Sequence, residues 1–68
     1  MNEDKFNTEL RKFLKKVGIT SQREIEKAIQ DAITSGGLSG DETLDAVVTL
    51  EVPGAGLTTR IDGKIALE

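Results

Sequence analysis

The sequence predicts an α+β fold in which two antiparallel helices pack on one face of a C-terminal β-hairpin. Apolar residues recur every three or four positions up to residue 34, and every second position from Leu44 onward. The first spacing places side chains on one face of an α-helix, and the second places them on one face of a strand. All 68 residues are expected to form a single small domain, residues 1–68.

The first helix is predicted over residues 3–17. Asn2 is a suitable N-cap, and Glu3 and Asp4 place negative charge in the first turn, where the helix dipole favours it. Gly18 is expected to end this helix, because glycine adopts a left-handed conformation without steric cost. Its apolar face consists of Phe6, Leu10, Phe13, Leu14 and Val17.

The second helix is predicted over residues 21–34, after a connection at residues 19–21. Ser21 and Glu24 have the spacing of a capping box, in which each side chain accepts a hydrogen bond from the backbone N–H of the other. Gly36 and Gly37 are expected to end the helix after Ile33 or Thr34. Its apolar face consists of Ile25, Ala28, Ile29, Ala32 and Ile33.

The hairpin is predicted to have strands at residues 44–52 and 57–67, joined by a turn at residues 53–56. Pairing Val52 with Leu57 matches apolar residues across the strands and sets Asp45 opposite Lys64. Residues 62–63, an Asp-Gly pair, are also typical of a tight turn, but a turn there would mix charged and apolar groups on each face. The favoured interpretation is one long second strand with a kink or bulge at Gly63.

Composition limits the kinds of site that the chain can form. It contains no cysteine and no histidine, so disulfides are absent and a zinc site is close to excluded. The first residues lack the basic segment and apolar run of a leader, and no apolar stretch approaches membrane-spanning length, so we expect a soluble, cytoplasmic protein without a membrane partner. Residues 67–68 are compatible with a native end or with a tag remnant.

Charge is distributed unevenly along the chain. Residues 1–20 carry a net charge of +2, residues 21–37 carry −1, and residues 38–68 carry −4, for a total of −3. Basic residues gather late in the first predicted helix, where they could contact an anion or a protein partner. Favourable interaction with the C-terminal end of that helix is the simpler explanation. These candidate contact residues are Arg11, Lys12, Lys15 and Lys16.

No catalytic or cofactor-binding signature is present, and we expect no enzyme and no cofactor. Acid–base and nucleophilic catalysis most often use histidine or cysteine, and both are missing. The carboxylates Asp41, Glu42 and Asp45 lie close in sequence but lack the spacing of a calcium loop. The polar loop that leads into the first strand explains them without a metal.

Two functions from different classes remain. The leading hypothesis is a non-enzymatic interaction module that binds an unidentified protein or forms a homodimer through the open edges of the hairpin. The alternative is a nucleic-acid-binding protein of helix-turn-helix type, with its turn at residues 17–20. The predicted recognition helix is net negative and the hairpin is acidic, so phosphate repulsion argues against nucleic-acid binding.

The chain resembles a small family of uncharacterised bacterial proteins of about this length. The resemblance is carried by residues 11–26, with residues 2–4 at the start of the chain and residues 65–68 at its end. The resemblance spans most of the chain and is densest from Arg11 to Ala28. It implies a bacterial, cytoplasmic protein and favours a native C-terminus. It implies no function and no site residues.

Overall fold

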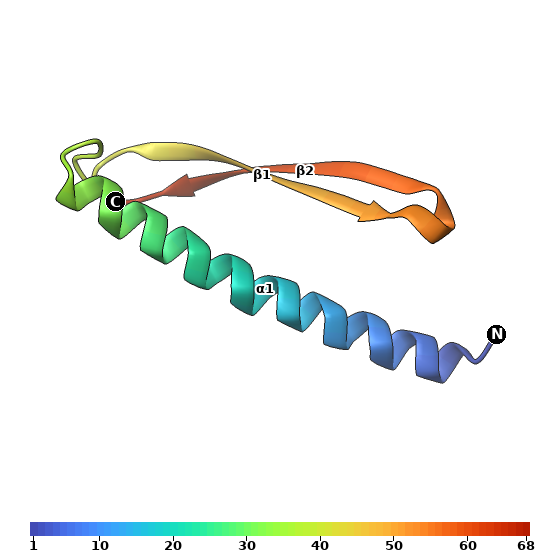
Figure 1. The fold of residues 1–68 in the computed structure, drawn as a ribbon. Helices are drawn as coiled ribbons and strands as arrows, with labels where there is room; N and C mark the ends of the chain where they lie inside the picture. Colours follow the sequence, from blue (N-terminus) through green and yellow to red (C-terminus); the bar gives the residue numbers. More distant parts are fainter. The chain divides into compact units, whose positions relative to one another are not determined.

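A computed structural model describes all 68 residues, which form one helix followed by a β-hairpin (Figure 1). The helix α1 spans Glu3–Thr34, and the strands β1 and β2 span Thr43–Val52 and Leu57–Ala66. A short 3₁₀ turn, η1, at Pro53–Ala55 joins the strands. The chain divides into two compact units, Met1–Gly37 and Leu38–Glu68.

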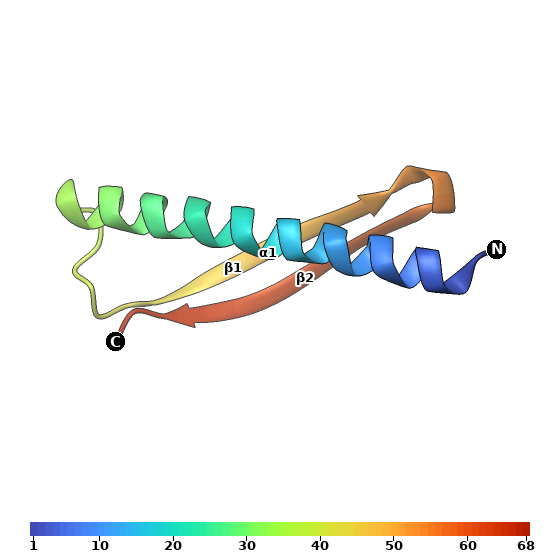
Figure 2. The same cartoon turned by 90° about the horizontal axis from the view of Figure 1, so that it is seen from below.

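The prediction of two helices is wrong, although the α+β class is correct. Figure 2 shows α1 as one uninterrupted helix, so neither the end at residue 17 nor the start at residue 21 exists. Ser21 and Glu24 lie in the helix interior and form no capping box. Instead, Gln22 Nε2 donates to Glu26 Oε1 at 2.8 Å, which is a hydrogen bond between adjacent turns of one helix.

The physical reason for the continuous helix is the balance of two costs at Gly18. A glycine in a helix interior costs about 1 kcal/mol relative to alanine. Starting a second helix requires a new nucleus, for which a nucleation constant of about 10⁻³ corresponds to roughly 4 kcal/mol. The smaller cost is to continue through the glycine, and no proline in this segment prevents it.

The helix α1 begins where the first helix was predicted to begin, and it ends where the second helix was predicted to end. The Asn2 side chain accepts a hydrogen bond from the Lys5 backbone N–H at 3.0 Å, which confirms the N-cap. At the other end Gly36 has a φ of 84°, and its N–H donates to the carbonyl of Ile33. The Gly37 N–H donates to the carbonyl of Ala32 at 2.8 Å, which completes a Schellman motif.

The hairpin has the predicted register along its whole length. Val52 pairs with Leu57 and Asp45 pairs with Lys64 in an antiparallel two-stranded sheet. Gly63 pairs regularly with Ala46, so β2 is one long strand without the bulge expected there. The turn after Val52 is also confirmed, and Gly56 closes it with a φ of 66°. The Leu67 N–H donates to the Glu42 carbonyl at 2.9 Å and extends the pairing beyond β2.

Neither unit contains a buried residue. Each unit taken by itself is one layer, and a single helix or a two-stranded sheet cannot enclose its own apolar face. Large apolar side chains are consequently exposed on both units, and on α1 the exposed fraction reaches 50% for Phe6 and 51% for Leu14. The fold therefore leaves apolar surface available for contacts.

Candidate functional site

The four basic residues of the sequence prediction lie on the first half of α1 and form what we call the basic cluster. Arg11, Lys12, Lys15 and Lys16 are all exposed, and none of them forms an ion pair. Because α1 continues to Thr34, the cluster lies well before the helix end, and the last turn contains no basic residue. The interaction with a helix C-terminus therefore does not explain the cluster, while contact with an anion or a partner stays a prediction.

The second half of α1 has the opposite charge balance. It contains Arg23 and Lys27 against the acidic residues Glu24, Glu26 and Asp31, and all five are exposed. The helix thus carries a basic half and an acidic half on one rigid element. Such a rod-like charge separation can orient a partner, because opposite charges attract over about one Debye length.

An apolar stripe runs along α1 between these charged residues. Phe13 is 49% exposed and Leu10 is 41% exposed, while Val17, Ile29 and Ala32 are half-buried. Residues spaced by three or four positions share one face of a helix, so the stripe continues past Gly18. Exposed apolar surface rimmed by charged residues is typical of a protein-interaction site.

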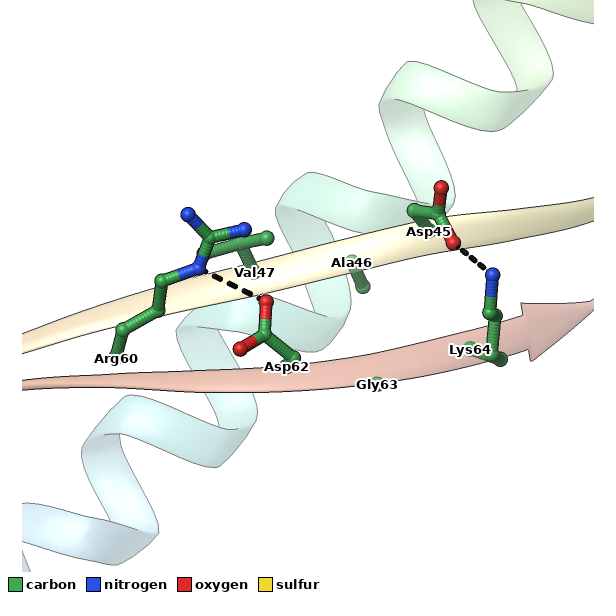
Figure 3. A pocket seen from close by; sticks show the side chains of 7 residues that line it. All are labelled: Asp45, Ala46, Val47, Arg60, Asp62, Gly63 and Lys64. Atoms are coloured by element: carbon green, nitrogen blue, oxygen red, sulfur yellow. Dashed lines mark hydrogen bonds and ion pairs between the residues drawn. The ribbon is translucent and has the colours of Figure 1, made fainter.

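The polar face of the hairpin carries two ion pairs (Figure 3). Lys64 Nζ pairs across the strands with Asp45, as the register predicted, and Arg60 Nε donates to Asp62 Oδ1 at 2.9 Å. Between them lies an open hollow lined by residues of both strands. All four charged side chains are more than 60% exposed, so the hollow does not exclude water from a ligand.

The loop that precedes β1 is organised by the carboxylate of Glu42. Its Oε2 atom accepts a hydrogen bond from the Ser39 backbone N–H at 2.8 Å, and its Oε1 atom accepts one from Gly40 at 2.9 Å. These backbone N–H groups, Ser39 first and Gly40 second, lower the pKa of the Glu42 carboxyl below its ordinary value of 4.5. The sequence analysis missed this role, although the preceding Ser-Gly pair is typical of such a turn.

The carboxylates that lie close in sequence do not converge on one point. Glu42 binds the loop backbone and Asp45 pairs with Lys64. No group of three histidine, cysteine, aspartate or glutamate side chains in the structure is placed to hold a metal ion. No helix in the structure combines the length and the apolar character that crossing a bilayer requires.

The helix-turn-helix interpretation is also wrong as a description of the structure. Its turn was predicted at residues 17–20, and these residues are helical. No second helix is present that could enter a DNA groove. The geometric argument for nucleic-acid binding is therefore removed.

The fold and its surfaces define a small α+β protein with one long amphipathic helix and one β-hairpin. The chain belongs to a family of unknown function, DUF6494, which matches it over residues 1–68. This match confirms the resemblance to an uncharacterised family over the whole chain. The comparison with curated proteins gives no match, and the comparison with solved structures gives none.

Proposed function

We propose that the chain is a non-enzymatic interaction module that functions as a homodimer. The observation that carries this proposal is that each unit taken by itself, a single helix and a two-stranded hairpin, has an apolar face and buries no residue. Burial of apolar surface is worth roughly 25 cal/mol per Å², and it is the main stabilising contribution to a small domain. A second copy supplies that burial without a disulfide or a metal.

The hairpin offers one contact for such a dimer. In a two-stranded sheet both strands are edges, and the backbone groups that point away from the partner strand can pair with another chain. Joining two hairpins at one edge produces a four-stranded sheet, which is more stable than an isolated hairpin. The ion pairs on the polar face leave these edge backbone groups free.

Sedimentation equilibrium of the full chain over a range of micromolar concentrations tests the proposal. A species of twice the 7.3 kDa chain mass, which dissociates on dilution, is the expected result. Amide hydrogen exchange at high concentration should then protect alternate amides along one strand, since these are the outward-pointing donors. A single 7.3 kDa species at every concentration would contradict homodimerisation.

A further inference from the structure

The free backbone groups at the two edges of the hairpin belong to residues of one face. The Leu67 N–H donates to the carbonyl of Glu42, which lies directly opposite in the register, so this pair is hydrogen-bonded. Hydrogen-bonded and non-hydrogen-bonded pairs alternate along an antiparallel ladder. The next pair, Thr43 with Ala66, and every second pair after it therefore direct their N–H and C=O groups outward. The outward residues are the odd-numbered ones of β1 and the even-numbered ones of β2.

The outward residues of the two strands differ in charge. On β1 the charged ones are Asp45 and Glu51, so no pairing of two β1 edges brings opposite charges together. On β2 the charged ones alternate in sign, as Arg60, Asp62 and Lys64. Opposite charges on neighbouring strands stabilise a sheet and like charges destabilise it. An edge with alternating charge can therefore attract a second copy of itself.

We infer that the homodimer forms by antiparallel pairing of two β2 strands, with the two-fold axis at Ile61. The inference rests on the proposed self-association and adds the strand, the orientation and the register of the contact. In this register nine of the ten residues of β2 have an opposite residue on the second β2 strand. Arg60 of each copy lies opposite Asp62 of the other, and the outward backbone groups of both residues face each other.

The other registers of the same two strands are less favourable. Three of them pair at least seven residues of β2 while keeping the outward groups face to face. An axis at residue 60 places Arg60 opposite itself. An axis at residue 62 places Asp62 opposite itself and Arg60 opposite Lys64, so both axes join like charges. An axis at residue 63 places Asp62 opposite Lys64, but it pairs only seven residues and leaves Leu57 without an opposite residue.

The ion pair within β2 fits an axis at Ile61. Arg60 Nε donates to Asp62 Oδ1 at 2.9 Å, and the two side chains are 68% and 63% exposed (Figure 3). The two-fold axis adds the same two residues of the second copy on the same face of the sheet. Each arginine then lies beside one aspartate along its own strand and opposite another across the contact. Exposed charges contribute to stability mainly where several of them form such a network.

The apolar face gains contacts in the same register. Ile61 is 55% exposed, the largest value among the large apolar residues of the two strands. The axis places Ile61 opposite Ile61 of the second copy, and it places Leu57, which is 40% exposed, opposite Ile65. Apolar pairs on neighbouring strands stabilise a sheet. The register that joins opposite charges on one face thus joins large apolar side chains on the other.

Pairing β2 of one copy with β1 of the next is the remaining alternative. It also joins opposite charges, since Lys64 can lie opposite Asp45 as it does within the hairpin. Such a head-to-tail contact leaves one edge of each kind free at the ends, so further copies add without limit. Pairing of two β2 edges instead produces a closed dimer. Both edges that stay free in that dimer are acidic β1 edges, which repel one another.

Amide hydrogen exchange resolved by NMR identifies the strand. The full chain is measured above and below the concentration at which the dimer dissociates in sedimentation. Dimerisation should slow exchange by about tenfold or more at the amides of residues 58, 60, 62 and 64, which point outward from β2. The amides of residues 45, 47, 49 and 51, which point outward from β1, should be unchanged.

The other results separate this inference from the proposed function. A dimer with slowed exchange at the outward amides of β1, or at neither edge, would overturn the inference and leave the proposed homodimer standing. Slowed exchange at both edges, with species that grow beyond the dimer in sedimentation, would show head-to-tail pairing and overturn the inference. A monomer at every concentration would overturn the proposed function as well.

Charge reversal identifies the register. In Arg60→Glu protein each copy places a glutamate opposite Asp62, and in Asp62→Lys protein each copy places a lysine opposite Arg60. Both variants should dissociate at about tenfold higher concentration than the parent chain, because two cross-strand pairs change from attractive to repulsive. An equimolar mixture should form a heterodimer with the parent affinity, since glutamate then lies opposite lysine. Neither chain of the mixture regains the ion pair within β2, so that pair cannot explain the recovery.

The matched control is Glu51→Lys, which makes the same change of charge as Asp62→Lys at an exposed outward position of β1. It should leave the dissociation concentration unchanged. An axis at residue 63 would place Arg60 opposite Ala66, so Arg60→Glu would have no effect and the mixture would not recover. Either of these two results, or an equal weakening by the control, would overturn the register with its axis at Ile61.

Discussion

The helical unit and the hairpin unit satisfy their backbone hydrogen bonds in opposite ways. In α1 each interior N–H finds its acceptor four residues away, so the helix depends on local contacts and on its two ends. In the hairpin the partners are far apart, and Asp45 pairs with a lysine 19 residues away. The helix is therefore sensitive to single residues that interrupt the chain locally, whereas the hairpin is held by a register that many residue pairs fix together.

The two units also differ in how their ends are held. The last turn of α1 is closed by the left-handed Gly36, and the first by the Asn2 side chain. The hairpin begins after a loop in which one carboxylate, Glu42, accepts two backbone hydrogen bonds. The left-handed backbone of Gly36 thus fixes the C-terminal end of α1, whereas an ionised side chain, that of Glu42, fixes the loop before β1.

The largest expected effect is that of Gly18→Pro, which tests whether α1 is one helix. Proline removes a backbone donor and clashes with the carbonyl of Leu14, at a cost of about 3 kcal/mol in a helix interior. Far-UV circular dichroism should show a large loss of helical signal. If residues 19–21 formed a connection between two helices, proline at position 18 would lie outside both of them, and the helical signal would change little.

This sensitivity to a single residue explains why the hairpin was predicted correctly and the helix was not. The register followed from several residue pairs at once, because a slip by one residue would move every apolar side chain to the wrong face. The break at Gly18 depended on one glycine and one apparent capping box. The spacing of Val17, Ser21 and Ile25, each four residues apart, was the available signal that the helical period continues.

The functional surfaces were only partly predictable for the same reason. The sequence identified the basic cluster, but the assumed helix end after Val17 supplied an explanation for it that the structure removes. The role of Glu42 depends on the left-handed backbone of Gly40, whose φ is 101°. That conformation is set by the whole loop, and the sequence pattern alone did not show which carboxylate it would bind.

The substitution Gly36→Ala should destabilise the end of α1 by about 1 to 2 kcal/mol. The φ of 84° at this residue lies in the left-handed region, which side chains with a Cβ adopt at a cost of that size. Hydrogen exchange of the last helical turn should become faster, because the Schellman hydrogen bonds depend on this conformation. Unchanged exchange of the backbone amides at positions 36 and 37 would contradict the assigned helix end.

The substitution Gly18→Ala should change stability in the opposite direction and stabilise α1 by about 1 kcal/mol. A Cβ atom at Gly18 meets no heavy atom within 4 Å, so the gain in helix propensity carries no steric cost. Thermal unfolding followed by circular dichroism should show a higher midpoint than in the parent chain. A lower midpoint would mean that Gly18 has a conformation that alanine cannot adopt.

A pH-dependent effect on stability is expected at Glu42, whose carboxylate holds the loop before β1. Because the pKa of this carboxyl is lowered in the folded state, its contribution to stability is present above the ordinary value of 4.5 and is lost as the pH falls through the folded-state pKa. NMR titration of Glu42 should give a pKa below 4.5. Glu42→Gln should remove this acid-sensitive contribution, and an equal acid sensitivity in both proteins would assign it to other groups.

The smallest effect on stability is expected from removing the ion pair between Asp45 and Lys64, which joins the two strands on the polar face of the hairpin (Figure 3). Both side chains are more than 70% exposed, and exposed ion pairs contribute about 0.5 kcal/mol or less. A double-mutant cycle with Asp45→Asn and Lys64→Met should give a coupling energy in this range, and it should fall as salt is added. A coupling energy of about 2 kcal/mol would show that water is excluded from this face, and that would require a second molecule to cover it. The cycle measured above and below the dissociation concentration of the dimer therefore determines whether the polar face of the hairpin takes part in self-association.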